Sequence, residues 1–372
     1  MSHLLSKLPL KSRRQKLIGL CLLAAFAFVG FGVLRGWRHK EDPLVSTPKL
    51  AVETLSGHSL YYNGPARLWI AAQKPELLTA EDKQDGSERV RAFAQAVQSP
   101  NLFRQLDRQN RFDTLFLVGD PSTYRPLLDH LLDTPDWTLT YLDHTSLIFR
   151  RNGSDSWADA KLQVLRKKFA EAPTRDQAKV LAGVAVKLIA VRKRELGKKL
   201  ADEATELDAG LPDGWSALAR YHLERGEWNP AIADADRALE IDDDYLHALA
   251  SKAQALYATK HFSDAYRVSK KLIEKLPDDP GVLFYFAKIC HEAHAFEEEI
   301  KALQKLISLA EQCQRPTSEY RIYLGQAFAR TGKAPEALEQ YGKALADPDL
   351  PQDQQTEVRK TMEQIRAKVG AN

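Results

Sequence analysis

The sequence of 372 residues predicts three consecutive parts: a single N-terminal transmembrane helix, a small α/β domain, and an all-α solenoid of helical pairs. Three observations support this prediction. Residues 17–34 contain no charged side chain, residues 58–151 mix strand-like and helical patterns, and an alanine recurs at a fixed interval further on. Ala231 and Ala265 are 34 residues apart, and Ala337 follows after 72, which is two intervals and four extra residues. Helical pairs with a 34-residue period indicate stacked repeats that present a binding surface.

The best-preserved repeat begins at Pro212. Small residues occupy its eighth, twentieth and twenty-seventh positions, as Ala219, Ala231 and Ala238. Two helices that cross closely leave room only for small side chains at such positions, and Trp215 would fill the space beside the crossing. This pattern resembles the tetratricopeptide repeat (TPR) family. The resemblance implies a solenoid whose role is to bind a protein or peptide partner.

The other repeats begin at Leu246, Pro280, Ser318 and, in a weaker match, Ala178. The repeat from Pro280 departs at its twentieth position, where Glu299 replaces the alanine. We therefore expect about four to five repeats over residues 178–347. Residues 348–372 should form a capping helix, since the last repeat would otherwise expose an apolar face to water. Ordinary amphipathic helices are the alternative interpretation, because they share the same apolar spacing.

The apolar run at residues 17–34 is long enough to cross a membrane. As a helix with a rise of 1.5 Å per residue it would span roughly 27 Å, close to the thickness of the hydrocarbon core. Five basic residues precede it and three follow, which favours a cytoplasmic tail at residues 1–16 and a body on the other side. We therefore expect a single-pass protein of the bacterial inner membrane with a periplasmic body. A cleaved signal peptide is the competing interpretation, but no A-x-A site follows.

A linker is expected at residues 35–57, the α/β domain at 58–151 and a connecting helix at 152–177. The predicted strands are Leu60–Tyr62, Leu68–Ala72, Phe112–Val118 and a hairpin of Trp137–Leu142 with Ser146–Arg150. The predicted helices are Glu88–Val97 and one that follows Pro121 as far as Leu132.

Part of this domain resembles the soluble extracytoplasmic tail of bacterial polytopic glycosyltransferase-like proteins. The matching pieces include Asn63-Gly64, Phe112-Asp113 before an apolar strand, and Trp137 with Tyr141. The family's catalytic acids lie in loops between membrane helices that this chain lacks, so the resemblance implies no transferase activity. It makes a membrane glycosyltransferase a second candidate partner.

Composition argues against several functional classes. Residues 1–40 hold eight Lys or Arg and no acidic residue, which leaves 45 basic and 50 acidic residues in the other 332. The body is therefore slightly acidic and has no basic stripe of the kind that binds nucleic acid. The three cysteines have no metal-ligand spacing, and no phosphate loop or catalytic triad pattern is present. We expect neither an enzyme nor a cofactor.

A few side chains leave a chemical role open. Asp120 follows a predicted strand, where α/β proteins often bind ligands, but it fits a helix N-cap better. An enzyme in this domain would need Asp120 or Asp143 in a cleft. His291 and His294 could begin a zinc site, although further ligands are not evident. A disulfide between Cys290 and Cys313 is also left open.

The first helix of each TPR repeat lines a concave groove, and the resemblance places certain positions of that helix in it. The residues at those positions are Arg220, Gln254, Tyr257, Phe284, Lys288, His291, Gln326 and Arg330. Aromatic rings can bury apolar side chains of a peptide, and Lys or Arg can pair with its carboxylates. The sequence thus predicts a membrane-anchored scaffold in a bacterial envelope assembly. The alternative is a non-catalytic accessory subunit of a glycosyltransferase system, whose α/β domain contacts glycan or the transferase.

Overall fold

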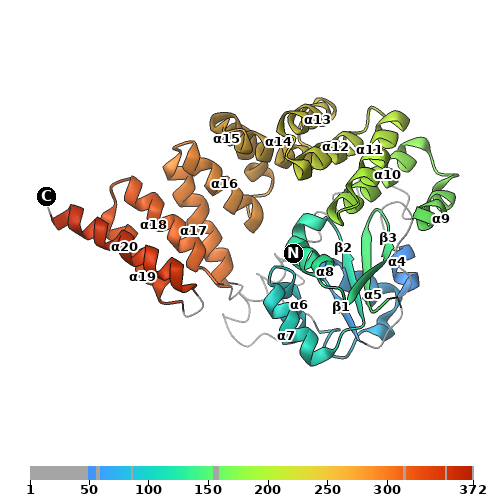
Figure 1. Cartoon of the computed structure of the whole chain (residues 1–372), viewed down its shortest axis with the longest axis horizontal. Coiled ribbons are helices and arrows are strands. Elements are labelled where there is room, and N and C mark those ends of the chain that lie inside the picture. Colours follow the sequence, from blue (N-terminus) through green and yellow to red (C-terminus); the bar gives the residue numbers. More distant parts are fainter. Residues whose placement is uncertain are drawn as a thin grey trace, which may run out of the picture. The chain divides into compact units, whose positions relative to one another are not determined.

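The structure is a computed structural model that describes residues 49–55, 59–84, 87–153, 159–312, 316–347 and 350–370 (Figure 1). The predicted membrane segment at residues 17–34 lies outside these ranges, as do Cys21 and Cys313. Among the described residues, no helix combines the length and the apolar composition needed to cross a membrane. The chain divides into two compact units, Met1–Tyr221 and His222–Asn372.

The first unit contains a four-stranded sheet. Its strands are β1 (Leu60–Tyr62), β2 (Thr114–Val118), β3 (Trp137–Leu142) and β4 (Ser146–Arg151). The order is β1-β2-β4-β3, in which β1 runs parallel to β2 while β4 is antiparallel to both β2 and β3. Every residue of β2 is buried, as its continuous apolar sequence predicts. These strands confirm four of the five predicted ones.

The fifth predicted strand is wrong. Leu68–Ala72 lies inside helix α5 (Gly64–Gln73), because the Asn63 side chain accepts a hydrogen bond from the Ala66 N–H and a proline stands in the first turn. A capping asparagine followed by proline starts a helix, and this local signal outweighs the apolar run that suggested a strand.

Other helices surround the sheet. They are α4 (Lys49–Thr54), α6 (Glu88–Ala96), α7 (Pro100–Asn110) and α8 (Arg125–Asp133), with a short 3-10 helix η2 (Pro121–Tyr124) before α8. The sequence predicted α6 and α8 but not α7. Helix α4 falls in the range expected to be a linker, and it buries Ala51 and Val52 completely.

Paired helices follow, and their bounds match the predicted repeats. Helix α9 (Asp159–Phe169) precedes them. The pairs are α10 (Thr174–Ala190) with α11 (Arg194–Leu207), α12 (Pro212–Arg225) with α13 (Trp228–Ile241), α14 (Leu246–Ala258) with α15 (Phe262–Lys275), α16 (Pro280–Glu292) with α17 (Phe296–Gln312), and α18 (Ser318–Arg330) with α19 (Ala334–Leu345). Helix α20 (Gln352–Gly370) packs after the last pair through Val358 and Met362. In four of the pairs, the first helix begins at the residue where a repeat was predicted to begin, namely Pro212, Leu246, Pro280 and Ser318.

Small residues lie where the paired helices approach. Ala231, Ala265 and Ala337 are all 0 % exposed. A Cβ atom added to Gly325 would lie only 2.8 Å from the ring of Tyr341. Gly197 stands at the twentieth position of the repeat that begins at Ala178, and an added Cβ atom there would lie 2.7 Å from a side-chain carbon of Ile189. This pair therefore crosses so closely that even alanine would be crowded.

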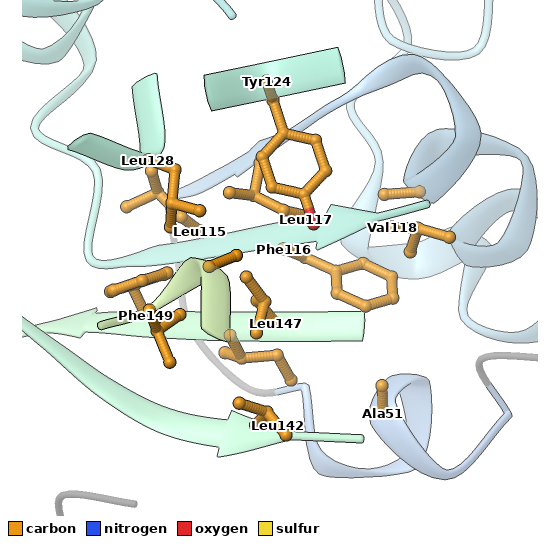
Figure 2. Close-up of a cluster of buried hydrophobic side chains, with 14 of the residues drawn as sticks. Ala51, Leu115, Phe116, Leu117, Val118, Tyr124, Leu128, Leu142, Leu147 and Phe149 are labelled. Carbon is orange, nitrogen blue, oxygen red and sulfur yellow. The ribbon is translucent and has the colours of Figure 1, made fainter. Parts of the chain in front are cut away.

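One hydrophobic core joins the α/β domain to the first helices of the array. Figure 2 shows part of it, with Tyr124 and Leu128 packed over β2 and with Leu147 and Phe149 of β4 beside it. The same buried cluster continues through α10 and α11 as far as Leu218 of α12. The α/β domain and the first helical pair therefore belong to one folding unit.

Close contacts also cross this joint within the first unit. Lys187 of α10 is 4 % exposed, and its ammonium group donates a hydrogen bond to the Gly119 carbonyl at the end of β2. Gly183 lies against the turn between β3 and β4, where an added Cβ atom would be 2.7 Å from the Cβ of His144. Arg192, just after α10, pairs with Asp133 of α8 at 2.6 Å.

Candidate functional site

Five aromatic side chains from α14, α16 and α18 form two groups of contacting rings in the second unit. They are Tyr257, Phe284, Tyr285, Tyr320 and Tyr323. The ring centroids of Tyr257 and Tyr285 are 5.7 Å apart, and Phe284 lies 5.2 Å from Tyr320 and 5.4 Å from Tyr323. All five are half-buried, so each ring packs partly against the protein and still reaches solvent. We call this set the aromatic row.

Three tyrosines of the row hold their hydroxyl protons more tightly than a free tyrosine does. Burial raises the pKa of Tyr257, Tyr285 and Tyr323, and nearby carboxylates raise that of Tyr257 and Tyr323 further. A tyrosine with an apolar body and a hydroxyl donor can bury an apolar side chain and hydrogen-bond the backbone next to it. The row therefore offers both kinds of contact to an extended chain.

One cation lies against a ring of the row, and a second lies against Phe296 of α17. The Lys288 ammonium nitrogen lies 5.9 Å from the centre of the Phe284 ring, and the Arg330 guanidinium lies at the same distance from the Phe296 ring. Neither makes an ion pair within the described residues. Many other lysines and arginines of this unit do, such as Lys252, which pairs with Asp236. Lys288 and Arg330 are therefore available to pair with an external carboxylate.

A histidine next to these cations has a buried partner. The Nδ1 atom of His291 lies 2.9 Å from Oε1 of Glu299, whose residue is 1 % exposed. The other carboxylate oxygen of Glu299 is buried and has no hydrogen-bond partner. A buried carboxylate thus contacts the imidazole ring at Nδ1, and 16 % of the His291 side chain remains exposed.

The structure places the eight sequence-predicted residues unevenly. Seven lie in the second unit, where Gln254 is exposed on α14 and Gln326 is half-buried on α18. Arg220 lies in the first unit, on α12, with a guanidinium nitrogen 3.9 Å from Oδ1 of Asp120. The sequence analysis missed Tyr285, Tyr320 and Tyr323. Tyr285 and Tyr323 are both the sixth residue of their repeats, from Pro280 and Ser318, and this equivalence is the signal that could have identified them.

The first helices of successive repeats begin at Pro212, Leu246 and Pro280, one period apart, and small buried residues lie at their crossings. This period and these small residues are the pattern typical of TPR repeats. Glu299 occupies the position that holds Ala231, Ala265 or Ala337 in the other repeats.

Comparisons with known proteins find TPR structures. Neither a family model nor a curated protein matches the chain. Among solved structures it resembles MamA (residues 41-end) from Desulfovibrio magneticus RS-1, at 18 % identity and a TM-score of 0.41, covering 46 % of this chain and 94 % of that one. It also resembles YrrB, described as a TPR protein with an unusual peptide-binding site, at 18 % identity and a TM-score of 0.43, covering 50 % and 92 %. TTC0263, a TPR protein of Thermus thermophilus, gives 19 % identity and a TM-score of 0.35, covering 51 % and 99 %.

The two carboxylates considered as catalytic candidates, Asp120 and Asp143, make hydrogen bonds within the α/β domain. Asp120 accepts a hydrogen bond from the Ser122 N–H and caps η2, as the N-cap interpretation predicts. Asp143 is 0 % exposed and accepts hydrogen bonds from Tyr141, Thr145 and Ser146. Both carboxylates therefore hold the fold of the α/β domain.

The metal and thiol candidates lie in the α16–α17 region. His294 is in the turn between these helices, in a left-handed conformation with φ of 59°. Within the described ranges, no three His, Cys, Asp or Glu side chains gather as a metal site would require. Cys290 is a buried free thiol, and burial raises its pKa well above the ordinary value.

Proposed function

We propose that this chain is a membrane-anchored TPR scaffold of a bacterial envelope assembly, and that the aromatic row captures a protein partner. The observation that supports this proposal most is the row itself, together with Lys288 and Arg330, to neither of which a described carboxylate is paired. Five half-buried rings present apolar area that a partner can cover. The two cations favour a partner segment that carries a carboxylate next to an apolar side chain.

Capture should depend on charge at the row. We expect the double substitution Lys288→Glu and Arg330→Glu to reduce recovery of the partner from solubilised membranes about tenfold or more, because charge-assisted hydrogen bonds contribute about 1.5–3 kcal/mol each. The matched control is Lys301→Glu with Lys368→Glu, which changes the net charge equally at exposed positions on α17 and α20. Equal recovery by the two double variants would refute the role of the row.

The anchoring part of the proposal rests on residues 17–34 and has its own test. Alkaline phosphatase fused to the end of the chain should be active, and a reporter that works only in the cytoplasm should not be. The reverse pattern would place the body in the cytoplasm. Recovery of a polytopic glycosyltransferase in the capture experiment would favour the accessory-subunit hypothesis.

A further inference from the structure

Glu299 is an anomaly within the TPR array. It stands at the twentieth position of its repeat, and it is 1 % exposed where the alanines of neighbouring repeats are 0 % exposed. Moving a carboxylate out of water is unfavourable unless the protein supplies hydrogen bonds or an opposite charge. Alanine at this position would avoid that loss and match the other repeats.

The protein satisfies Glu299 only in part. One oxygen meets His291 Nδ1 at 2.9 Å, and the other is buried without a partner. A buried polar network stabilises a core when each of its groups has a hydrogen-bond partner. A network that leaves a group without a partner destabilises the core. Stability alone therefore does not explain this residue.

The contact with His291 has a clear chemical result. We assign the shared hydrogen to Nδ1, with the Glu299 oxygen as its acceptor. The neutral imidazole then carries its lone pair on Nε2, at the other edge of the ring, where it can accept a hydrogen bond. Glu299 thus fixes both the tautomer and the orientation of the ring.

The His291 ring lies near both Lys288 and Arg330. Lys288 and His291 are three residues apart and so lie on one side of α16. His291 and Arg330 both lie against the Phe296 ring, at 6.4 Å and 5.9 Å. His291 thus lies next to Lys288 on α16 and shares the Phe296 ring with Arg330, so each donor for a carboxylate has the same acceptor beside it.

We propose that Glu299 is a positioning residue, and that through His291 it makes the row selective for a partner segment in which a hydrogen-bond donor, such as a Ser or Thr hydroxyl, lies next to an acidic residue. This inference rests on the proposed function, and it names the chemistry of the partner. Lys288 and Arg330 bind the acid, while His291 Nε2 accepts from the donor.

The probes are synthetic arrays of short peptides with apolar residues around an acidic site. One pair of arrays compares Asp with Asn, and a second pair compares Thr with Val next to the Asp. Purified wild-type protein should prefer Asp over Asn, and it should prefer Thr over Val by about three- to tenfold, the range for one hydrogen bond. Glu299→Ala should lose the Thr preference and keep the Asp preference.

Two further variants separate positioning from folding. Glu299→Gln keeps a carbonyl that can accept from Nδ1, so it should retain the Thr preference even if alanine disturbs local packing. Glu297→Ala, at an exposed position of the same helix, should bind like the wild type. Glu299→Ala should also melt at or above the wild-type temperature.

The outcomes distinguish a failure of the proposed function from a failure of the role assigned to Glu299. A wild-type protein without the Asp preference would refute the proposed function and this inference with it. A protein that prefers Asp but not Thr, or a Glu299→Ala variant that keeps the Thr preference, would overturn the inference alone.

Discussion

Lys187 carries a charge that folding removes from water, and this should appear in how stability varies with pH. Burial lowers its pKa from 10.5 to about 8, although the carboxylates of Asp120 and Asp143 act in the opposite direction, while Arg220 adds to the lowering. The difference corresponds to about 3 kcal/mol of folding free energy, at about 1.4 kcal/mol for each pH unit.

The sign follows from which state holds the proton more tightly. The folded pKa is the lower one, so between about 8 and 10.5 the unfolded chain keeps a proton that the folded chain has lost. The free energy of unfolding should therefore rise as the pH is raised through this range. Below about pH 8 the penalty of the buried charge is fully present.

The assay is urea unfolding of the wild type and of Lys187→Met at several pH values from 7 to about 10.5, a span set by the two pKa values. Other groups titrate in both proteins, so the informative quantity is the difference between their unfolding free energies. It should change by about 3 kcal/mol in favour of the wild type as the pH rises. Lys199→Met, at an exposed position of α11, should give no such change. Parallel profiles for the wild type and Lys187→Met would refute the reasoning.

Two predictions concern positions where backbone segments pack closely. Ala231→Leu should destabilise the protein by about 1–3 kcal/mol through overpacking, whereas Ala233→Leu, at an exposed position of the same helix, should change stability by less than about 0.5 kcal/mol. Equal melting temperatures would mean that the repeat register is wrong. Gly183→Ala should be destabilising because the new Cβ would meet His144, whereas Gly342→Ala, with open space around it, should stabilise by about 0.5–1 kcal/mol. Thermal melts test both pairs, and a stabilised Gly183→Ala variant would show that the turn can move away.

The repeats could be predicted from the sequence because their signal is periodic. A spacing of one repeat length fixed the start of α12, α14 and α16, and it fixed which alanines are buried. The α/β domain has no such repetition, so single local signals decided each element there. Leu68–Ala72 was misassigned because its apolar run was given more weight than the cap at Asn63.

The candidate site could be predicted only in part. Lys288 and His291 follow from their repeat positions, but the role of Glu299 depends on a contact between two helices that no sequence pattern measures. Nothing in the sequence indicated that Lys187 reaches Gly119, because the two residues are 68 positions apart. A test of partner capture that deleted residues 58–151 would therefore expose the core of α10 and α11, and it would report unfolding in place of lost binding.

The continuous core of the first unit also bears on how the array comes apart. Arrays of repeats usually open from their ends, because a terminal repeat has one neighbour where the others have two. At the N-terminal end, α10 and α11 are covered by the sheet and its helices. At the other end, α20 is held mainly by Val358 and Met362 on one side. Amide hydrogen exchange should therefore be fastest in α20 and slowest in β2 and α10. Because the α/β domain covers only one end of the solenoid, local unfolding should begin at the C-terminal helices, while the repeats next to the sheet stay folded.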